Sequence, residues 1–138
     1  MDSAEAMLVS SPTGYRVVLA ESNGLGYTNR QRFSFAHELG HLLLNLSEHL
    51  HSGAQHKHES GQTHVERLCD SIASEILMPR AAFLHDADSI GWSLSSLMSL
   101  ASMYQTSISA TAIRMVDLMP RACVLGVWRL PDENSTSP

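Results

Sequence analysis

The stretch RFSFAHELGHLLLN, residues 32–45, places two histidines and a glutamate inside an otherwise apolar run. Its apolar residues recur at three- and four-residue spacing, which predicts a helix with one buried face. Ser34 is the expected N-cap, and the helix should run to about Leu46. Polar groups on a packed helix are costly to bury unless something satisfies them. We therefore expect this helix to present its polar side chains to a cleft, where a metal ion satisfies them.

His37 and His41 are four residues apart within HELGH, so on a helix both lie on one face. Two imidazoles placed in this way can both reach a zinc ion at about 2.0–2.1 Å. Glu38 follows the first histidine, where its carboxylate can take a proton from a water that zinc has acidified. The alternative is a pair of solvated histidines beside an ordinary surface glutamate, and the apolar neighbours argue against it.

A third ligand is expected on a second helix, from His64 to Met78, which Pro79 closes because proline cannot continue the helical ladder. Catalytic zinc usually takes three protein ligands and leaves one position for water. Glu66 is the expected third ligand. Asp70 falls on the same helical face one turn later, where its carboxylate can accept the second N–H of a zinc-bound histidine.

Glu66 also has an alternative interpretation. The stretch THVE, residues 63–66, matches a capping box in which the glutamate bonds the backbone at the start of the helix. One carboxylate does not easily serve both purposes, and the ligand role completes an otherwise deficient site. Glu75 is a competing carboxylate, but nine residues place it about 180° around the helix from Glu66.

The remaining elements are indicated by local patterns. Gly14–Glu21 is rich in β-branched residues and flanked by turn residues, which predicts a strand, with Leu25–Thr28 as a candidate hairpin partner. Two more helices are expected at Ser93–Tyr104 and Ser107–Leu118, joined by a tight turn at Gln105–Thr106. A last strand is expected at Cys123–Leu130. The helix pair has the short turn of a DNA-binding helix-turn-helix. Its second helix carries one basic residue, Arg114, so packing against the catalytic layer is the favoured role.

The length of 138 residues predicts one α+β domain with a core of about 14–130. Residues 1–12 and 131–138 are expected to be tails, and residues 47–62 a His-rich loop. The histidines of this region either form a secondary metal site or, as we favour, are solvated: His49, His51, His56, His58 and His64.

The composition argues against several classes of protein. A formal net charge of −5, with only nine Lys and Arg, does not fit a nucleic-acid binder that works through a basic face. No apolar run approaches the roughly 20 residues of a membrane span, and the first residues lack a signal-peptide pattern. Cys69 and Cys123 are far apart, so we expect reduced thiols in a cytoplasmic protein.

Taken together, these motifs resemble the ImmA/IrrE family of zinc metallopeptidases. The likeness is clearest in RxRFSFAHELGHLLL, which begins at Arg30, and in ExxxDxxASEILMP, which ends at Pro79. A weaker likeness is present at residues 100–115. Family members commonly have Ala and Asn where this chain has Cys69 and Asp70. Asp70 keeps the hydrogen-bonding capacity, whereas Cys69 is placed where it can touch the metal or be oxidised.

The resemblance implies a zincin-like fold, with a small β-hairpin or sheet packed on the HExxH helix and on a second, ligand-bearing helix. A C-terminal helix pair and a short last strand would follow. It implies one zinc ion held by His37, His41 and Glu66, with Glu38 as the base. It also implies cleavage of a protein substrate, a helix-turn-helix repressor, in a bacterial stress-response or mobile-element switch.

The expected mechanism is zinc-assisted peptide hydrolysis, with the substrate extended along the edge of the strand Gly14–Glu21. Sequence spacing does not choose between the candidates for the oxyanion or substrate contacts, which are Tyr27, His85, Tyr104 and Arg114. Two other functions remain open. One is a zinc-holding module that binds a repressor or another partner without cleaving it. The other is a DNA-binding regulator, although we expect neither direct nucleic-acid contact nor membrane association.

Overall fold

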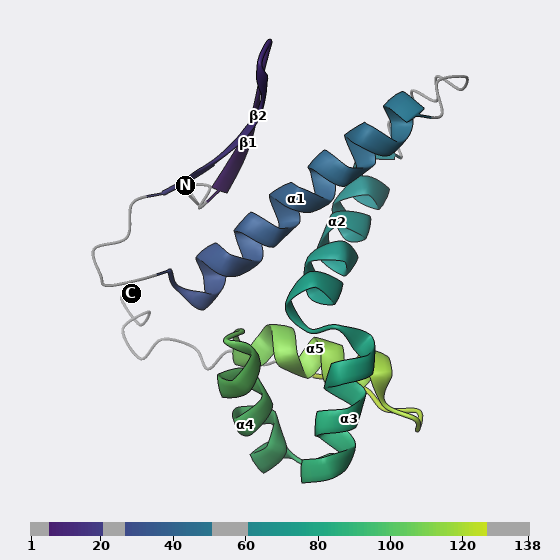
Figure 1. Ribbon diagram of the computed structural model, residues 1–138. Helices are drawn as coiled ribbons and strands as arrows, with labels where there is room; N and C mark the ends of the chain where they lie inside the picture. Colours follow the sequence, from purple (N-terminus) through teal and green to yellow (C-terminus); the bar gives the residue numbers. More distant parts are fainter. Residues whose placement is uncertain (1–5, 21–26, 51–60, 127–138) are drawn as a thin grey trace, which may run out of the picture.

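The computed structural model describes residues 6–20, 27–50 and 61–126, which form an α+β fold of one two-stranded antiparallel sheet and five helices. Figure 1 shows the hairpin beside α1, α1 lying along α2, and α3 to α5 grouped at one end of that pair. The elements are β1 (Ala6–Ser11), β2 (Gly14–Leu19), α1 (Asn29–Leu50), α2 (Gly61–Leu77), α3 (Arg80–Ile90), α4 (Leu94–Tyr104) and α5 (Ile108–Leu118). Within these ranges, no helix combines the length and the apolarity that crossing a bilayer requires.

The hairpin differs from the predicted pairing. β2 pairs along its whole length with β1, in antiparallel register, and not with residues 25–28. Residues 27 and 28 belong to no strand, and residues 25 and 26 lie outside the described residues. The prediction of a tail at residues 1–12 is wrong for β1, because the run AMLVSS reaches β2 across a two-residue turn. Gly14 follows that turn with a φ of 133°, a conformation that favours glycine.

The helix α1 begins five residues before the predicted N-cap Ser34. The Gln31 N–H donates to Thr28 Oγ1 at 3.1 Å, and the Thr28 N–H donates to Gln31 Oε1 at 2.9 Å. This reciprocal pair is a capping box, so the helix starts at Asn29 and Ser34 lies inside it. Gln31 also donates through Nε2 to the Ala20 carbonyl at 2.8 Å, which ties the end of the hairpin to α1.

Small residues let α1 and α2 approach closely. Ala36 on α1, and Cys69 and Ala73 on α2, are almost completely buried. A Cβ at Gly40 would lie 3.1 Å from the Cys69 Cα and 3.3 Å from its carbonyl oxygen, closer than ordinary van der Waals contact. Glycine is therefore required at this crossing, which accounts for a residue that is otherwise unfavourable inside a helix.

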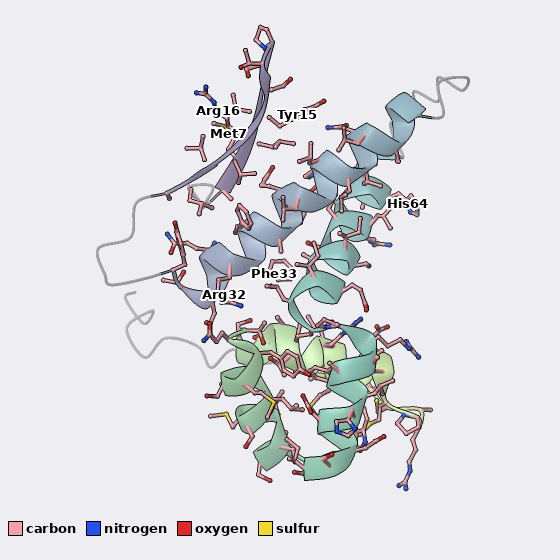
Figure 2. The ribbon with its side chains drawn as sticks, in the orientation of Figure 1. Met7, Tyr15, Arg16, Arg32, Phe33 and His64 are labelled. Atoms are coloured by element: carbon pink, nitrogen blue, oxygen red, sulfur yellow. The ribbon has the colours of Figure 1, made fainter. Side chains whose placement is uncertain are left out.

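The bounds of the two helices shorten the predicted His-rich loop. α1 continues to Leu50 and α2 starts at Gly61, so residues 47–50, 61 and 62 are helical. Thr63 lies inside α2, so the prediction of a capping box at residues 63–66 is wrong. His64 is exposed on the outer side of α2, as Figure 2 shows. His51, His56 and His58, which were assigned to the loop, lie outside the described residues.

The helices α3, α4 and α5 enclose a separate apolar core. α3 has no counterpart in the predicted elements, whereas α4 and α5 match the two predicted helices. They start after Ser93 and Ser107, whose side chains accept from backbone N–H groups. The core consists of Met78, Phe83, Ala87, Leu97, Leu100, Ala112, Met115 and Leu118. Residues 123–126 form no strand, contrary to prediction, and residues 127–130 lie outside the described residues.

The start of α1 is bound to the turn between α4 and α5. Asn29 Nδ2 donates to the Thr106 carbonyl at 3.0 Å, and Arg32 Nη1 donates to Gln105 Oε1 at 2.7 Å. Figure 2 shows Arg32 on the side of α1 that faces this helical group. These two bonds couple the helix that carries HELGH to the C-terminal helices.

Arg114 fixes the other junction, between α2 and α5. Its guanidinium is buried and donates through Nε and Nη2 to the Met78 carbonyl at 3.1 and 2.9 Å. The same group pairs with Glu75. A hydrogen bond from the Arg80 backbone N–H, and the one from Arg114, lower the pKa of Glu75. Arg114 thus holds the end of α2, and both Glu75 and Arg114 are engaged in this structural contact.

Gly40→Ala should lower the free energy of unfolding by about 1–3 kcal/mol, because the added methyl group lies too close to the Cys69 backbone and forces α1 and α2 apart by a few tenths of an ångström. Helix propensity alone would give about 1 kcal/mol in the opposite direction. Urea denaturation measures the difference. Asn45→Ala, at an exposed position of α1, is the control and should change stability by about 0.5 kcal/mol or less. A more stable Gly40→Ala variant would contradict the close approach.

Arg114→Met should lower the free energy of unfolding by about 2–4 kcal/mol, because it leaves the buried Met78 carbonyl without its guanidinium donor and removes the ion pair with Glu75. Asp117→Asn is the control, since Asp117 is exposed and lies 3.6 Å from Arg114 Nη1. It should change stability by about 0.5 kcal/mol or less. Equal thermal unfolding curves for the two variants would show that Arg114 is not a structural anchor.

Candidate metal centre

Two imidazoles from α1 and one carboxylate from α2 meet where the helices lie side by side (Figure 1). His37 Nε2 lies 3.2 Å from Glu66 Oε2, and His41 Nε2 lies 3.6 Å from Glu66 Oε1. The one-turn spacing of the histidines puts both rings on the same face of α1, with centroids 4.9 Å apart. Each oxygen of Glu66 therefore faces one imidazole nitrogen.

Asp70 contacts the other nitrogen of His37. His37 Nδ1 lies 2.9 Å from Asp70 Oδ1. An ionised carboxylate can only accept, so Nδ1 carries the proton, and in the neutral ring Nε2 then offers a lone pair. That lone pair faces Glu66 Oε2, which is also an acceptor. Two facing acceptors are stabilised by a cation between them.

The separations of these atoms fit the coordination shell of a metal ion. Two donors that each lie about 2.0–2.1 Å from a tetrahedral ion are roughly 3.4 Å apart. The two nitrogen–oxygen separations at Glu66, 3.2 and 3.6 Å, bracket that value. The histidine side chains are 19% and 26% exposed, whereas Glu66 is 49% exposed. The donor set is therefore open to solvent on its carboxylate side.

Glu38 lies between the histidines in the sequence and reaches the hairpin. Its Oε2 accepts the backbone N–H of Leu8, on β1, at 2.9 Å. This contact orients the carboxylate against the edge of β1 that does not pair with β2. The strand edge beside the site is thus β1, and not the predicted strand Gly14–Glu21. Sequence reasoning missed this partner because the donor is a backbone group of a segment expected to be a tail.

The side chain of Cys69 lies close to those of the two histidines. It is fully buried, and its Sγ and one nitrogen from each of His37 and His41 all lie within 4.8 Å of one another. Burial, followed by the negative charges of Glu66, Asp70 and Glu38, raises the pKa of the Cys69 thiol. The described cysteines are free, and Cys69 is buried whereas Cys123 is exposed.

Two of the predicted oxyanion candidates have partners elsewhere in the structure. Arg114 is engaged by Glu75 and the Met78 carbonyl. The Tyr104 hydroxyl donates to Asp86 Oδ2 at 2.7 Å. Burial, and then the hydrogen bond and charge of Asp86, raise the pKa of Tyr104 to about 12. Both residues therefore serve contacts among the C-terminal helices, and sequence spacing could not reveal these partners.

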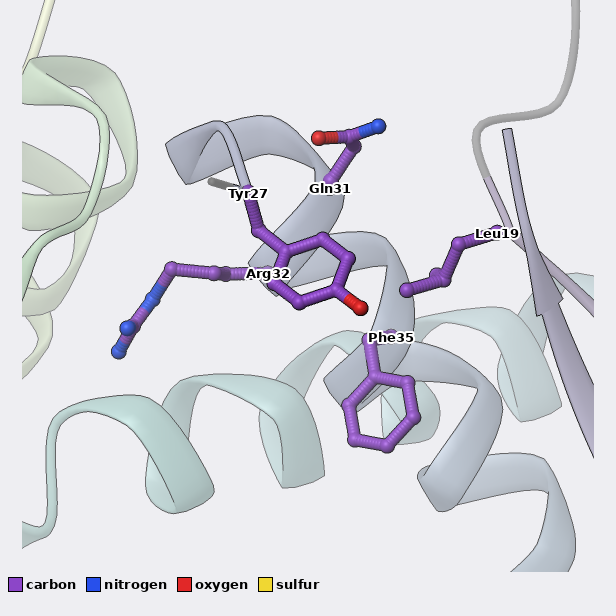
Figure 3. Close-up of a pocket in the computed structure, with 5 residues that line it drawn as sticks. All are labelled: Leu19, Tyr27, Gln31, Arg32 and Phe35. Carbon is purple, nitrogen blue, oxygen red and sulfur yellow. The ribbon is translucent and has the colours of Figure 1, made fainter. Parts of the chain in front are cut away.

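The other two candidates are exposed. His85 lies on α3. Tyr27 lines a cavity of about 260 Å³ with Leu19, Gln31, Arg32 and Phe35, and Figure 3 shows these five residues around it. Phe35 precedes Glu38 by three residues on α1, so this cavity lies within one helical turn of the candidate base. Of the four candidates, the structure brings Tyr27 to the α1 surface that carries the site.

Comparisons with known proteins point to a peptidase family. The family model described as the IrrE N-terminal-like domain, a peptidase family, matches residues 8–116. This range contains both helices of the candidate centre. The radiation response metalloprotease IrrE of Deinococcus radiodurans is 28% identical over 107 residues. That match covers 76% of this chain and 33% of the relative, so the chain spans about a third of that protein's length.

No solved structure matches the chain significantly. The family match covers more than half of the sequence and includes the HELGH segment together with Glu66 and Asp70. The chain therefore belongs to the IrrE N-terminal-like peptidase family, whose members are of the metallopeptidase type.

Proposed function

We propose that this chain is a zinc-dependent metallo-endopeptidase with a zincin-like arrangement of its hairpin and two site helices. His37, His41 and Glu66 would hold the ion, and Asp70 would fix the ring of His37. The observation that carries the proposal is the Glu66 carboxylate, whose two oxygens face the Nε2 atoms of the two histidines. Three protein donors leave the fourth position of a catalytic zinc site for water.

Glu38 is the proposed general base and acid. When bound, zinc lowers the pKa of water and polarises the scissile carbonyl. The Glu38 carboxylate takes a proton from the attacking water and later passes it to the leaving amine. The hydrogen bond from the Leu8 N–H holds one carboxylate oxygen in place, so the group is oriented before a substrate arrives.

The proposed substrate is an extended protein segment. β1 borders the site, and its outer edge can add a peptide strand through backbone hydrogen bonds. The cavity beside Phe35 is lined mostly by apolar and aromatic groups and would accept one side chain of that segment. We propose a helix-turn-helix repressor as the substrate, in a bacterial stress response and in the cytoplasm. The name of the Deinococcus relative, a radiation response metalloprotease, supports such a setting.

Glu38→Gln should bind zinc as well as the wild-type chain and lose at least about 100-fold in cleavage rate. Glutamine can still accept from the Leu8 N–H but cannot take the proton. Zinc content is measured by elemental analysis, and cleavage is followed on gels with a purified helix-turn-helix repressor from the same organism. Glu75→Gln is the control on α2 and should keep both zinc and cleavage. Full proteolysis by Glu38→Gln would overturn the mechanism, and zinc binding without any cleavage by the wild type would favour a binding module.

Asp70→Ala should weaken zinc affinity by about 10- to 100-fold, because His37 loses the acceptor that fixes its ring and tautomer. Asp70→Asn keeps an acceptor oxygen and should lose less. Competition with a chromophoric chelator measures these affinities. Asp88→Asn is the matched control and should bind zinc normally, because Asp88 lies on α3 and its carboxylate accepts from Trp92 Nε1. An unchanged affinity for Asp70→Ala would remove Asp70 from the centre.

A further inference from the structure

A second donor from α2 points to the same pair of histidines. Glu66 and Cys69 are three residues apart, which places them on neighbouring positions of one helical face. The carboxylate faces the imidazoles with its oxygens 3.2 and 3.6 Å from their nitrogens. The Cys69 sulfur shares a 4.8 Å cluster with one nitrogen of each histidine. An oxygen donor and a sulfur donor from α2 thus lie beside the same pair of histidines.

We propose that Cys69 Sγ is a fourth protein donor to the ion held by His37, His41 and Glu66. This inference rests on the proposed function, because it concerns the same ion. Donors on one tetrahedral zinc ion are separated by roughly 3.3–3.6 Å when sulfur at about 2.3 Å is included. The three atoms lie within 4.8 Å of one another, so binding one ion would bring any two of them closer by at most about 1.5 Å.

The packing of the helices keeps Cys69 where this bond forms. The crossing at Gly40 presses the Cys69 backbone against α1, immediately beside His41 in the sequence. The side chain is fully buried. A buried free cysteine is otherwise a small apolar group, but the sulfur of this one lies within 4.8 Å of one nitrogen of each of two histidines. Zinc binds sulfur and imidazole nitrogen in the same site, so this set of donor atoms suits it.

A thiolate donor would change the state of the centre. Four protein donors make a closed site, as in structural zinc sites, whereas a catalytic site keeps one position open for water. Cys69 and the attacking water would then compete for the same position. Cys69 in this way holds the resting chain at low activity, and removing the sulfur opens the centre.

X-ray absorption on the zinc-loaded full chain tests this directly. The wild type should show one sulfur at about 2.3 Å together with nitrogen and oxygen donors at about 2.0–2.1 Å. The cobalt-loaded chain should show a sulfur-to-cobalt charge-transfer band in the near ultraviolet. Cys69→Ala should lose both signals, keep one bound ion and cleave several-fold faster. Cys123→Ala, which removes the exposed cysteine, is the matched control and should keep both signals.

The outcomes separate this inference from the proposed function. A wild-type chain that binds one zinc ion through nitrogen and oxygen alone would overturn the role of Cys69 and leave the peptidase proposal standing. A chain that binds no zinc would overturn both. Sulfur signals that persist in Cys69→Ala would assign the donor to another residue. If Cys69→Ala does not fold, the wild-type absorption spectrum decides alone, with Cys69→Ser as the isosteric variant.

Discussion

The contact between α1 and α2 at Gly40 and Cys69 is the constraint on which the candidate site depends. A single methyl group at Gly40 would meet the backbone of Cys69 at 3.1 Å. Relieving this contact by moving the helices apart would also move Glu66 away from the histidine nitrogens, which it now faces at 3.2 and 3.6 Å. The geometry of the donors is therefore a consequence of small residues at a helix crossing, and the same crossing sets the position of the Cys69 sulfur.

The helix α1 also connects the other parts of the molecule to this crossing. Gln31 caps the helix and bonds the end of the hairpin, while Asn29 and Arg32 bond the turn between α4 and α5. Further along, Glu38 accepts from Leu8 on β1. Because these contacts lie along a single helix, the base and the two histidines keep fixed positions relative to the strand edge that borders them. Preorganisation of this kind is what hydrolytic sites require.

Short sequence patterns predicted the elements that are determined by interactions between residues close in the sequence. The two helices expected from Ser93 and from Ser107 are present as α4 and α5, and the spacing of His37 and His41 places both rings on one face. Ser34 was the wrong cap because the reciprocal pair of Thr28 and Gln31 starts the helix earlier. The strand partner of β2 and the partners of Tyr104 and Arg114 depend on tertiary contacts, which no spacing encodes.

The engagement of Arg114 narrows the chemistry of the site. Its guanidinium is bound to Glu75 and to the Met78 carbonyl, so it stabilises the end of α2 rather than a reacting oxygen. Tyr104 is likewise bound to Asp86. Of the two exposed candidates, Tyr27 lines the cavity beside Phe35, whereas His85 lies on α3. The hairpin side of α1 also holds β1 and its contact with Glu38. The candidate site thus lies between two neighbours of α1: the hairpin, which contacts Glu38, and α2, which supplies Glu66, Asp70 and Cys69.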